Sequence, residues 1–154
     1  MKKNYLLHFS LFMAMLLLPR AAWGQTVQSL DISRGSITIT STGYTIGDDH
    51  EQNYTGDYVI SGTTTSYTVT VSSGTHNITL NGASIDVSAT DDACAFSMAA
   101  DAQVNLTLTG ENVLTSGGSK AALNVPANAT LIIMEGSSGS LVANGGYKGA
   151  GIGG

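Results

Sequence analysis

The chain has 154 residues, with six Lys and Arg side chains against eleven Asp and Glu, which gives a formal net charge of −5. This acidic balance argues against nucleic-acid binding, which depends mainly on cations that neutralise phosphates. The single cysteine excludes an intrachain disulfide, and the low charge, 19 glycines and many Ser and Thr residues favour strands and turns over helices.

Residues 1–24 have the composition of a signal peptide. Lys2 and Lys3 form a basic head, a largely apolar run extends from Tyr5 to Leu18, and Ala22-Trp23-Gly24 places small residues where a signal peptidase cuts. We therefore expect cleavage near Gly24–Gln25 and export, which would make the protein secreted or cell-surface. The alternative is a membrane anchor, but such a helix needs roughly 20 apolar residues and this run is shorter.

Cleavage makes the chain more acidic. Three of the six cations lie in the signal peptide, so Arg34, Lys120 and Lys148 remain against all eleven acidic residues, for a net charge of −8. About 130 residues then remain, enough for one domain.

Residues 25–56 are predicted to form an N-terminal β cap. Apolar residues alternate in three short stretches, at Leu30/Ile32, Ile37/Ile39 and Tyr44/Ile46. This pattern predicts two or three strands. A cap is expected because the open end of a sheet is an edge that invites aggregation.

Residues 57–154 repeat with a period of about 27. Four series of apolar residues recur near this spacing: Val69, Phe96, Leu123 and Ala150; Val71, Met98, Val125 and Ile152; Tyr58, Ile85, Val113 and Leu141; and Ile78, Val104 and Leu131. Glycines recur after the last series, at Gly82, Gly110 and Gly136. The stretch 77–82 also matches 105–110 at a spacing of 28, and a β-bulge would reconcile the two alignments.

Each period holds three short alternating strands separated by turns rich in Gly, Ser, Asn and Asp. Strands this short bury their apolar faces by stacking on the same strand of the next repeat. We therefore predict an all-β, right-handed parallel β-helix, with a β-sandwich as the alternative. Residues 149–154 begin a further coil, so we expect more coils, and thus the remainder of a longer chain, beyond Gly154.

Several segments resemble a family of bacterial secreted carbohydrate-binding domains. The resemblance rests on Tyr58–Gly62, on Ile78–Gly82 with Ile85, and on Leu108–Leu114. It implies a fold like that of pectate lyases, and acidic plant polysaccharides and calcium as ligands. The segments Ala121–Pro126 and Gly151–Gly154 also resemble Gly-rich repeats in surface proteins of gut-type bacteria.

No catalytic residue is predicted. Gly47-Asp48-Asp49-His50 is superficially similar to the Gly-Asp-Asp element of polygalacturonases, but it lies outside the coils and that family's other motifs are absent. Cys94 has no cation nearby in sequence to stabilise a thiolate, so we interpret it as a small buried side chain. Catalytic residues in further coils are the alternative.

Calcium is the candidate metal. Asp86, Asp91 and Asp92 lie within seven residues, and calcium takes six to eight oxygen ligands, often from carboxylates. The alternative is a solvated acidic loop, paired with Lys120. Asp48, Asp49 and Glu51 form a second, weaker acidic cluster.

Three tyrosines are candidate sugar-binding residues, because an aromatic face offers flat apolar area with a polar edge. They are Tyr54, Tyr67 and Tyr147, and the alternative for each is packing at a turn or edge. Tyr58 belongs to an inward series and is predicted to be core.

Four Asn-x-Thr triplets begin at Asn53, Asn77, Asn105 and Asn128, and no function is assigned to them. Taken together, the sequence and the resemblance predict a non-catalytic carbohydrate-binding module with a polysaccharide or surface glycan as its partner. The alternative is a structural stalk or adhesin segment without a glycan site.

Overall fold

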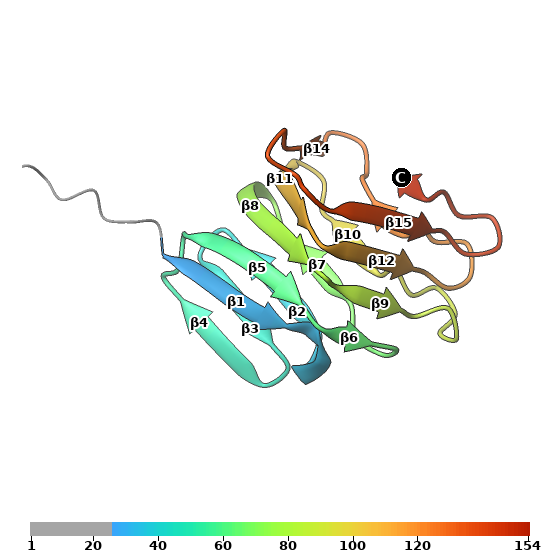
Figure 1. Ribbon diagram of the computed structural model, residues 1–154, viewed down its shortest axis with the longest axis horizontal. Helices are drawn as coiled ribbons and strands as arrows, with labels where there is room; N and C mark the ends of the chain where they lie inside the picture. Colours follow the sequence, from blue (N-terminus) through green and yellow to red (C-terminus); the bar gives the residue numbers. More distant parts are fainter. Residues whose placement is uncertain (1–25) are drawn as a thin grey trace, which may run out of the picture.

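Stacked parallel strands form a β-solenoid over residues 26–154, the part of the chain that the computed structural model describes (Figure 1). Strands make up 52% of these described residues and helix 2%, in about five turns of about 28 residues each. The predicted parallel β-helix is therefore confirmed. The signal peptide predicted for residues 1–24 lies outside the described residues.

Three sheets, here called A, B and C, run along the solenoid. Sheet A is entirely parallel and contains, in spatial order, β1 (Val27–Asp31), β5 (Asp57–Ser61), β8 (Gly74–Asn81), β11 (Ala102–Thr109) and β14 (Thr130–Ile133). Sheet C, also parallel, contains β15 (Ser140–Asn144), β12 (Glu111–Thr115), β9 (Ser84–Asp86) and β6 (Thr63–Thr64). Sheet B contains β16 (Ile152–Gly153), β13 (Leu123–Asn124), β10 (Phe96–Met98), β7 (Val69–Val71), β2 (Ile37–Thr40), β3 (Gly43–Ile46) and β4 (Asp49–Gln52).

Alternation within each strand builds the core. In β11, every second residue from Ala102 to Leu108 is buried, while the residues between them are only partly buried. Stacked strands then align their inward residues, as in the column Leu30, Ile60, Leu80 and Leu108. Burying one such side chain stabilises the fold by about 1.5–3 kcal/mol, so the columns hold the sheets together.

The segment predicted as a cap contributes to the solenoid in two ways. Its first strand, β1, pairs in parallel with β5, and β2 pairs in parallel with β7. A short 3-10 helix, Ile32–Arg34, connects β1 to β2. The strands β3 and β4 then extend sheet B with antiparallel pairing.

In sheet B the predicted 27-residue step is correct except at its last coil. Phe96 pairs with Val69 and Leu123, and Met98 pairs with Val71. However, Leu123 pairs with Ile152, so the predictions that placed Ala150 beside Leu123 and Ile152 beside Val125 are wrong. Six residues lie between Ile133 and Ser140, but only four lie between their partners Leu106 and Glu111. These two extra corner residues lengthen the step to 29.

The series that began at Tyr58 is wrong. Tyr58 pairs with Ile78 in sheet A, whereas Ile85 pairs with Leu114 in sheet C. Val113 faces outward, and Leu141 pairs with the buried Asn112. The series is wrong because the coil from β5 to β8 is only 20 residues long. Residues that lie 27 apart from Tyr58 onward therefore fall in different sheets.

The series in sheet A is correct for one of its two steps. Val104 pairs with Leu131, as predicted, but Ile78 pairs with Leu106 at the alternative spacing of 28. Gly82 and Gly110 share this spacing and both have φ near +65°, a left-handed conformation that favours glycine at a strand end. Gly139, and not the predicted Gly136, packs against the Gly110 carbonyl.

Two buried polar side chains connect neighbouring coils. Asn112 accepts a hydrogen bond from the Ala83 amide (2.9 Å) in one coil, and donates to the Ser140 carbonyl (3.0 Å) in the next. Ser116 accepts from the Ala95 amide (2.7 Å) and donates to the Ala121 carbonyl (2.9 Å). Both therefore satisfy backbone groups at corners, where the sheet ladder is interrupted.

Candidate functional site

The outer face of sheet A carries a row of polar side chains that runs across three coils. Asp57, Asn77 and Asn105 occupy matching positions on β5, β8 and β11. The Asn105 amide donates to Asn77 Oδ1 (2.8 Å), and the Asn77 amide donates to Asp57 Oδ1 (2.8 Å). Since the register aligns these residues and the hydrogen bonds link them, the row is ordered before any ligand binds.

A second row, of hydroxyls, lies beside the first. Thr79 and Thr107 are paired on β8 and β11 and point outward two residues further along each strand. The two rows, with Met134 at one end, line a shallow trough of about 290 Å³. We call this surface the sheet A trough.

The trough offers hydrogen-bonding groups without a cation. Each asparagine amide has two N–H groups and one carbonyl oxygen, so the hydrogen bonds within the row leave further donors and acceptors. The hydroxyls of Thr79 and Thr107 both donate and accept. Exposed apolar side chains, Ile132 and Met134, lie where the row meets β14. This combination suits a polyhydroxylated ligand with apolar ring faces.

The three predicted aromatic residues lie at separate places. Tyr54 is partly buried and packs edge-on against Tyr44 (5.9 Å between ring centroids) and Tyr58 (5.2 Å). Tyr67 is partly exposed just before β7, and Tyr147 is 91% exposed after β15, with Lys148 Nζ 5.6 Å from its ring centroid. They do not form one platform, and none of them lines the trough. Tyr58 is buried, so its prediction as core is confirmed.

Two of the three predicted calcium ligands interact with other residues of the protein. Hydrogen bonds from Ser88 lower the pKa of the Asp86 carboxyl, whose oxygen accepts from the Ser88 amide at 3.1 Å. Asp92 Oδ1 lies 3.9 Å from Lys120 Nζ, and Asp91 is exposed beside it. Within residues 26–154, no three His, Cys, Asp or Glu side chains are grouped as metal ligands.

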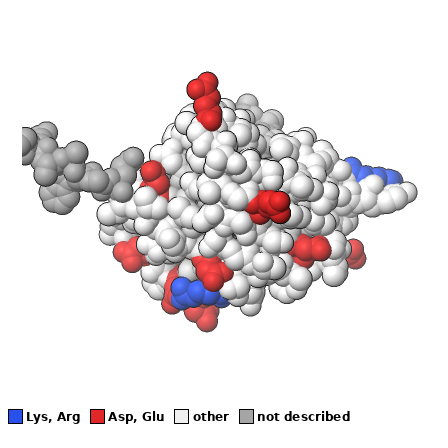
Figure 2. Space-filling view, viewed as in Figure 1, with Lys and Arg blue, Asp and Glu red and all other residues white. Residues whose placement is uncertain are grey.

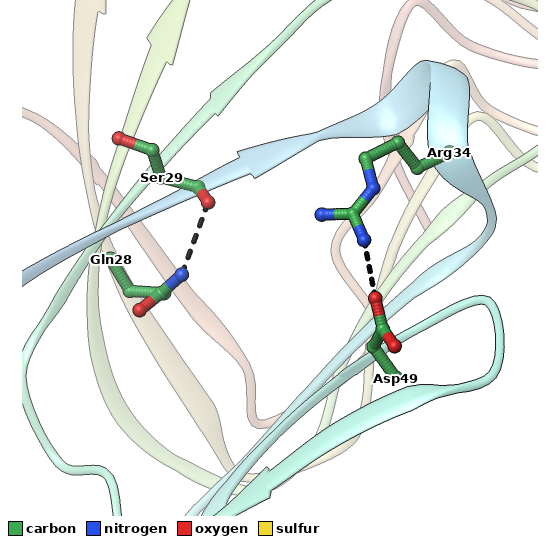
Figure 3. A network of polar contacts seen from close by, with 4 residues as sticks. All are labelled: Gln28, Ser29, Arg34 and Asp49. Carbon is green, nitrogen blue, oxygen red and sulfur yellow. Dashed lines mark hydrogen bonds and ion pairs between the residues drawn. The ribbon is translucent and has the colours of Figure 1, made fainter.

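The second acidic cluster lies on β4 and beside it. Arg34 forms an ion pair with Asp49, near the β1 side chains of Gln28 and Ser29 (Figure 3). This pair belongs to a cleft of about 210 Å³ between β1 and the β3–β4 hairpin. The cleft is lined by both signs of charge, since Arg34, Asp49 and Glu51 all contribute to it.

Cys94 is partly buried just before β10. Its thiol hydrogen-bonds to the carbonyl oxygens of Ala121 (3.1 Å) and Phe96 (3.2 Å). Burial raises the pKa of the thiol, which keeps it protonated. This environment is that of a packed side chain and disfavours a thiolate nucleophile.

Charge is sparse over the visible face of the solenoid, where acidic side chains lie singly or in small groups (Figure 2). No helix among the described residues is long and apolar enough to cross a membrane.

Sequence reasoning missed the Asp57–Asn77–Asn105 row. The signal was present, because Asn77 and Asn105 both begin Asn-x-Thr triplets and lie 28 residues apart. Only the register of β8 on β11 places both amides on the same outward row. Comparisons with family models, with curated proteins and with solved structures return no match to the chain.

Proposed function

We propose that the chain is a non-catalytic carbohydrate-binding module of a secreted or cell-surface protein, and that the glycan lies across the sheet A trough. The observation that supports this proposal is the hydrogen-bonded row Asp57–Asn77–Asn105 beside the hydroxyls of Thr79 and Thr107. Neighbouring strands lie about 4.8 Å apart, so the three polar side chains of the row follow one another at this spacing. A polysaccharide, whose hydroxyls also recur at regular intervals, complements such a surface.

The composition of the trough favours binding over hydrolysis. Glycoside hydrolysis uses a pair of carboxylates that flank the scissile bond. Asp57 is the only carboxylate that lines the trough, and its oxygen accepts a hydrogen bond from Asn77. The row therefore serves to orient hydroxyl groups.

Replacing one amide of the row tests the proposal. Asn105→Ala removes the amide at the end of the row and should weaken glycan binding about fivefold, since one net hydrogen bond contributes about 1 kcal/mol. Asn124→Ala is the matched control, because Asn124 lies outside the trough, next to Ser97 in sheet B. Binding to a glycan array that includes pectic fragments, followed by calorimetry, measures both. Equal affinities for the two variants and the parent would exclude the trough.

Calcium and acidic glycans remain a finer prediction. A net charge of −8 repels a polyuronate unless a cation intervenes, and a bound calcium can share its coordination between protein and sugar carboxylates. Binding to acidic glycans should then disappear with a chelator and return with calcium. Asp91→Asn together with Asp92→Asn should weaken it without unfolding the chain. Pectin binding that persists in chelator would remove this site.

The alternative, a structural stalk or adhesin segment, is favoured by the stacked coils themselves, which resemble a spacer. It predicts that no glycan on the same array binds the chain. If no glycan, neutral or acidic, binds the chain with or without calcium, the stalk interpretation replaces the binding module.

A further inference from the structure

A cavity of about 200 Å³ lies near the trough, between the start of β8, the end of β2 and the loop before β5. The side chains that matter for its chemistry are those of Ser41, Tyr54, Thr55, Tyr58, Thr75 and His76. We call it the tyrosine cavity. It is separate from the cleft beside Arg34 and from the trough, whose lining residues are different.

The partly buried Tyr54 forms a fixed apolar wall of this cavity, and the buried Tyr58 supports it. The Tyr54 and Tyr58 rings meet at 62° with 5.2 Å between their centroids. The Tyr54 hydroxyl donates to the carbonyl oxygens of Thr26 and Asp57, and the Tyr58 hydroxyl donates to the Gly43 carbonyl at 3.4 Å. Because backbone groups hold both hydroxyls, the rings cannot easily rotate away, and binding costs little side-chain entropy.

A buried imidazole supplies a hydrogen-bond acceptor. His76 is only 6% exposed, and its Nε2 lies 3.3 Å from the Ser73 carbonyl. A carbonyl oxygen can only accept, so Nε2 carries the proton. In a neutral imidazole this leaves Nδ1 as an acceptor for a hydroxyl donor.

The rim adds hydroxyls and no charge. Ser41, Thr55 and Thr75 are exposed, and none of the residues that line the cavity is Lys, Arg, Asp or Glu. Two other pockets do carry charge. The cleft beside Arg34 contains that cation and two carboxylates, and a further pocket contains Lys120 and Lys148. An uncharged, hydroxyl-rich cavity with an aromatic wall favours an uncharged sugar ring over a charged one.

The cavity also adjoins the trough. Thr75 and Asn77 are alternate residues of β8, about 7 Å apart along the same outer face. Gly56 lines the cavity, and the next residue, Asp57, begins the polar row. A single glycan can therefore occupy both places.

From this geometry we infer that the tyrosine cavity is a subsite for one uncharged pyranose of the glycan that lies in the trough. The inference rests on the proposed function and adds to it a position and a ligand class. The sugar ring packs on Tyr54, which Tyr58 supports from behind, one sugar hydroxyl donates to His76 Nδ1, and the remaining hydroxyls bond to the rim.

Free monosaccharides test the subsite directly. Titration of the chain with glucose, galactose, mannose or xylose, followed by NMR, should give shifts at Tyr54 and His76 for at least one of them. The dissociation constant should be on the order of millimolar, as expected for so few atoms. Galacturonate should give no shifts at these residues. If no neutral monosaccharide perturbs them, the inference is wrong.

Two variants separate specific binding from general effects. Thr75→Trp places an indole at the rim and should abolish the shifts, whereas Thr63→Trp, at another exposed threonine on β6, should not change them. If Thr75→Trp does not fold, Ser41→Ala with Thr75→Val should still weaken the monosaccharide at least fivefold. Unchanged binding in these cavity variants would overturn the inference.

Polymer binding to the trough and monosaccharide binding to the cavity are separate measurements, so the two proposals can fail separately. If Asn105→Ala weakens polymer binding while Thr75→Trp leaves it unchanged and no monosaccharide binds, the subsite fails and the proposed function stands. If neither polymer nor monosaccharide binds the parent chain, both fail.

Discussion

Asn112 shows how one residue links successive coils. Its carbonyl oxygen accepts from the Ala83 amide, and its amide group donates to the carbonyl oxygens of Ser140 (3.0 Å) and Thr109 (3.2 Å). The side chain is 1% exposed, so water cannot replace these contacts. Asn112 therefore acts as a structural polar residue inside an otherwise apolar column.

Replacing Asn112 should consequently cost more than one hydrogen bond. Asn112→Leu leaves the buried Ala83 amide without its partner and removes the side-chain hydrogen bonds to the Ser140 and Thr109 carbonyls, of which the Thr109 carbonyl keeps the Gly82 amide. A buried unsatisfied group costs about 1–3 kcal/mol, and the lost hydrogen bonds add to this. Urea denaturation should show a loss of several kcal/mol in the free energy of unfolding. Asn144→Leu, at an exposed position of β15, should change it by less than about 1 kcal/mol. A stable Asn112→Leu variant would contradict this role.

Tyr58 makes the fold sensitive to alkaline pH. Burial, with smaller contributions from Tyr54 and Tyr44, raises the pKa of Tyr58 from 10.0 to about 12. Its phenol is therefore protonated in the folded chain at pH values where an unfolded chain would ionise. This contribution to stability is fully present below pH 10 and is lost as the pH rises through about 12.

Urea midpoints measured between pH 9 and 12 test this effect. The parent should lose stability over that range, and Tyr58→Phe should lose less, because it has no phenol to ionise. Tyr147→Phe, at a residue that is 91% exposed, should follow the parent. Identical pH profiles for the parent and Tyr58→Phe would assign the alkaline transition to other groups.

At the scale of the strand, β10 illustrates the inward columns. Met98 is 2% exposed and pairs with Val71, while Ser97 between the two buried residues of β10 faces outward. Met98→Asp would bury an unpaired carboxylate, at a cost of several kcal/mol against a typical total of 5–15 kcal/mol. Circular dichroism and proteolysis should show unfolding. Ser97→Asp should remain ordered, and equal order in both variants would refute the column.

How far the sequence predicts the strands depends on the corners between them. The step Val69–Phe96–Leu123 stays at 27 only because changes in corner length cancel around the coil. Over the same coils the step is 28 in sheet A, from Ile78 to Leu106, and 29 in sheet C, from Ile85 to Leu114. Tyr58 was assigned to the wrong series because the turn from β5 to β8 is short. A periodic pattern gives the spacing between residues but not the sheet to which each residue belongs. The residues that form strands were therefore predictable from the sequence, whereas the register between strands was predictable only in part.

The same limit explains the candidate site. Tyr54, Tyr67 and Tyr147 were selected for their chemistry, yet the structure holds them apart. Asn77 and Asn105 were recognised as triplets, but their common row appears only when β8 is aligned with β11. A surface assembled across coils, residue by residue, depends on register, which is the quantity that sequence periodicity determines least well.

For the whole molecule, the feature with the widest consequence is the outermost strand of sheet B. All four residues of β4, Asp49, His50, Glu51 and Gln52, are exposed, and no strand among the described residues pairs with its outer edge. Charged side chains on an edge strand discourage edge-to-edge association. The charged β4 strand therefore disfavours the pairing of a second chain at this end of sheet B.

Removing the charges of β4 should allow chains to associate with one another. Asp49→Val with Glu51→Val would give β4 an apolar, β-branched edge, so chains should associate at that end and scatter light as their concentration rises. Glu111→Val with Asp91→Val removes the same charge away from the edge strands and should not add to association. The four exposed residues of β4 would then be what disfavours edge-to-edge growth at this end of sheet B.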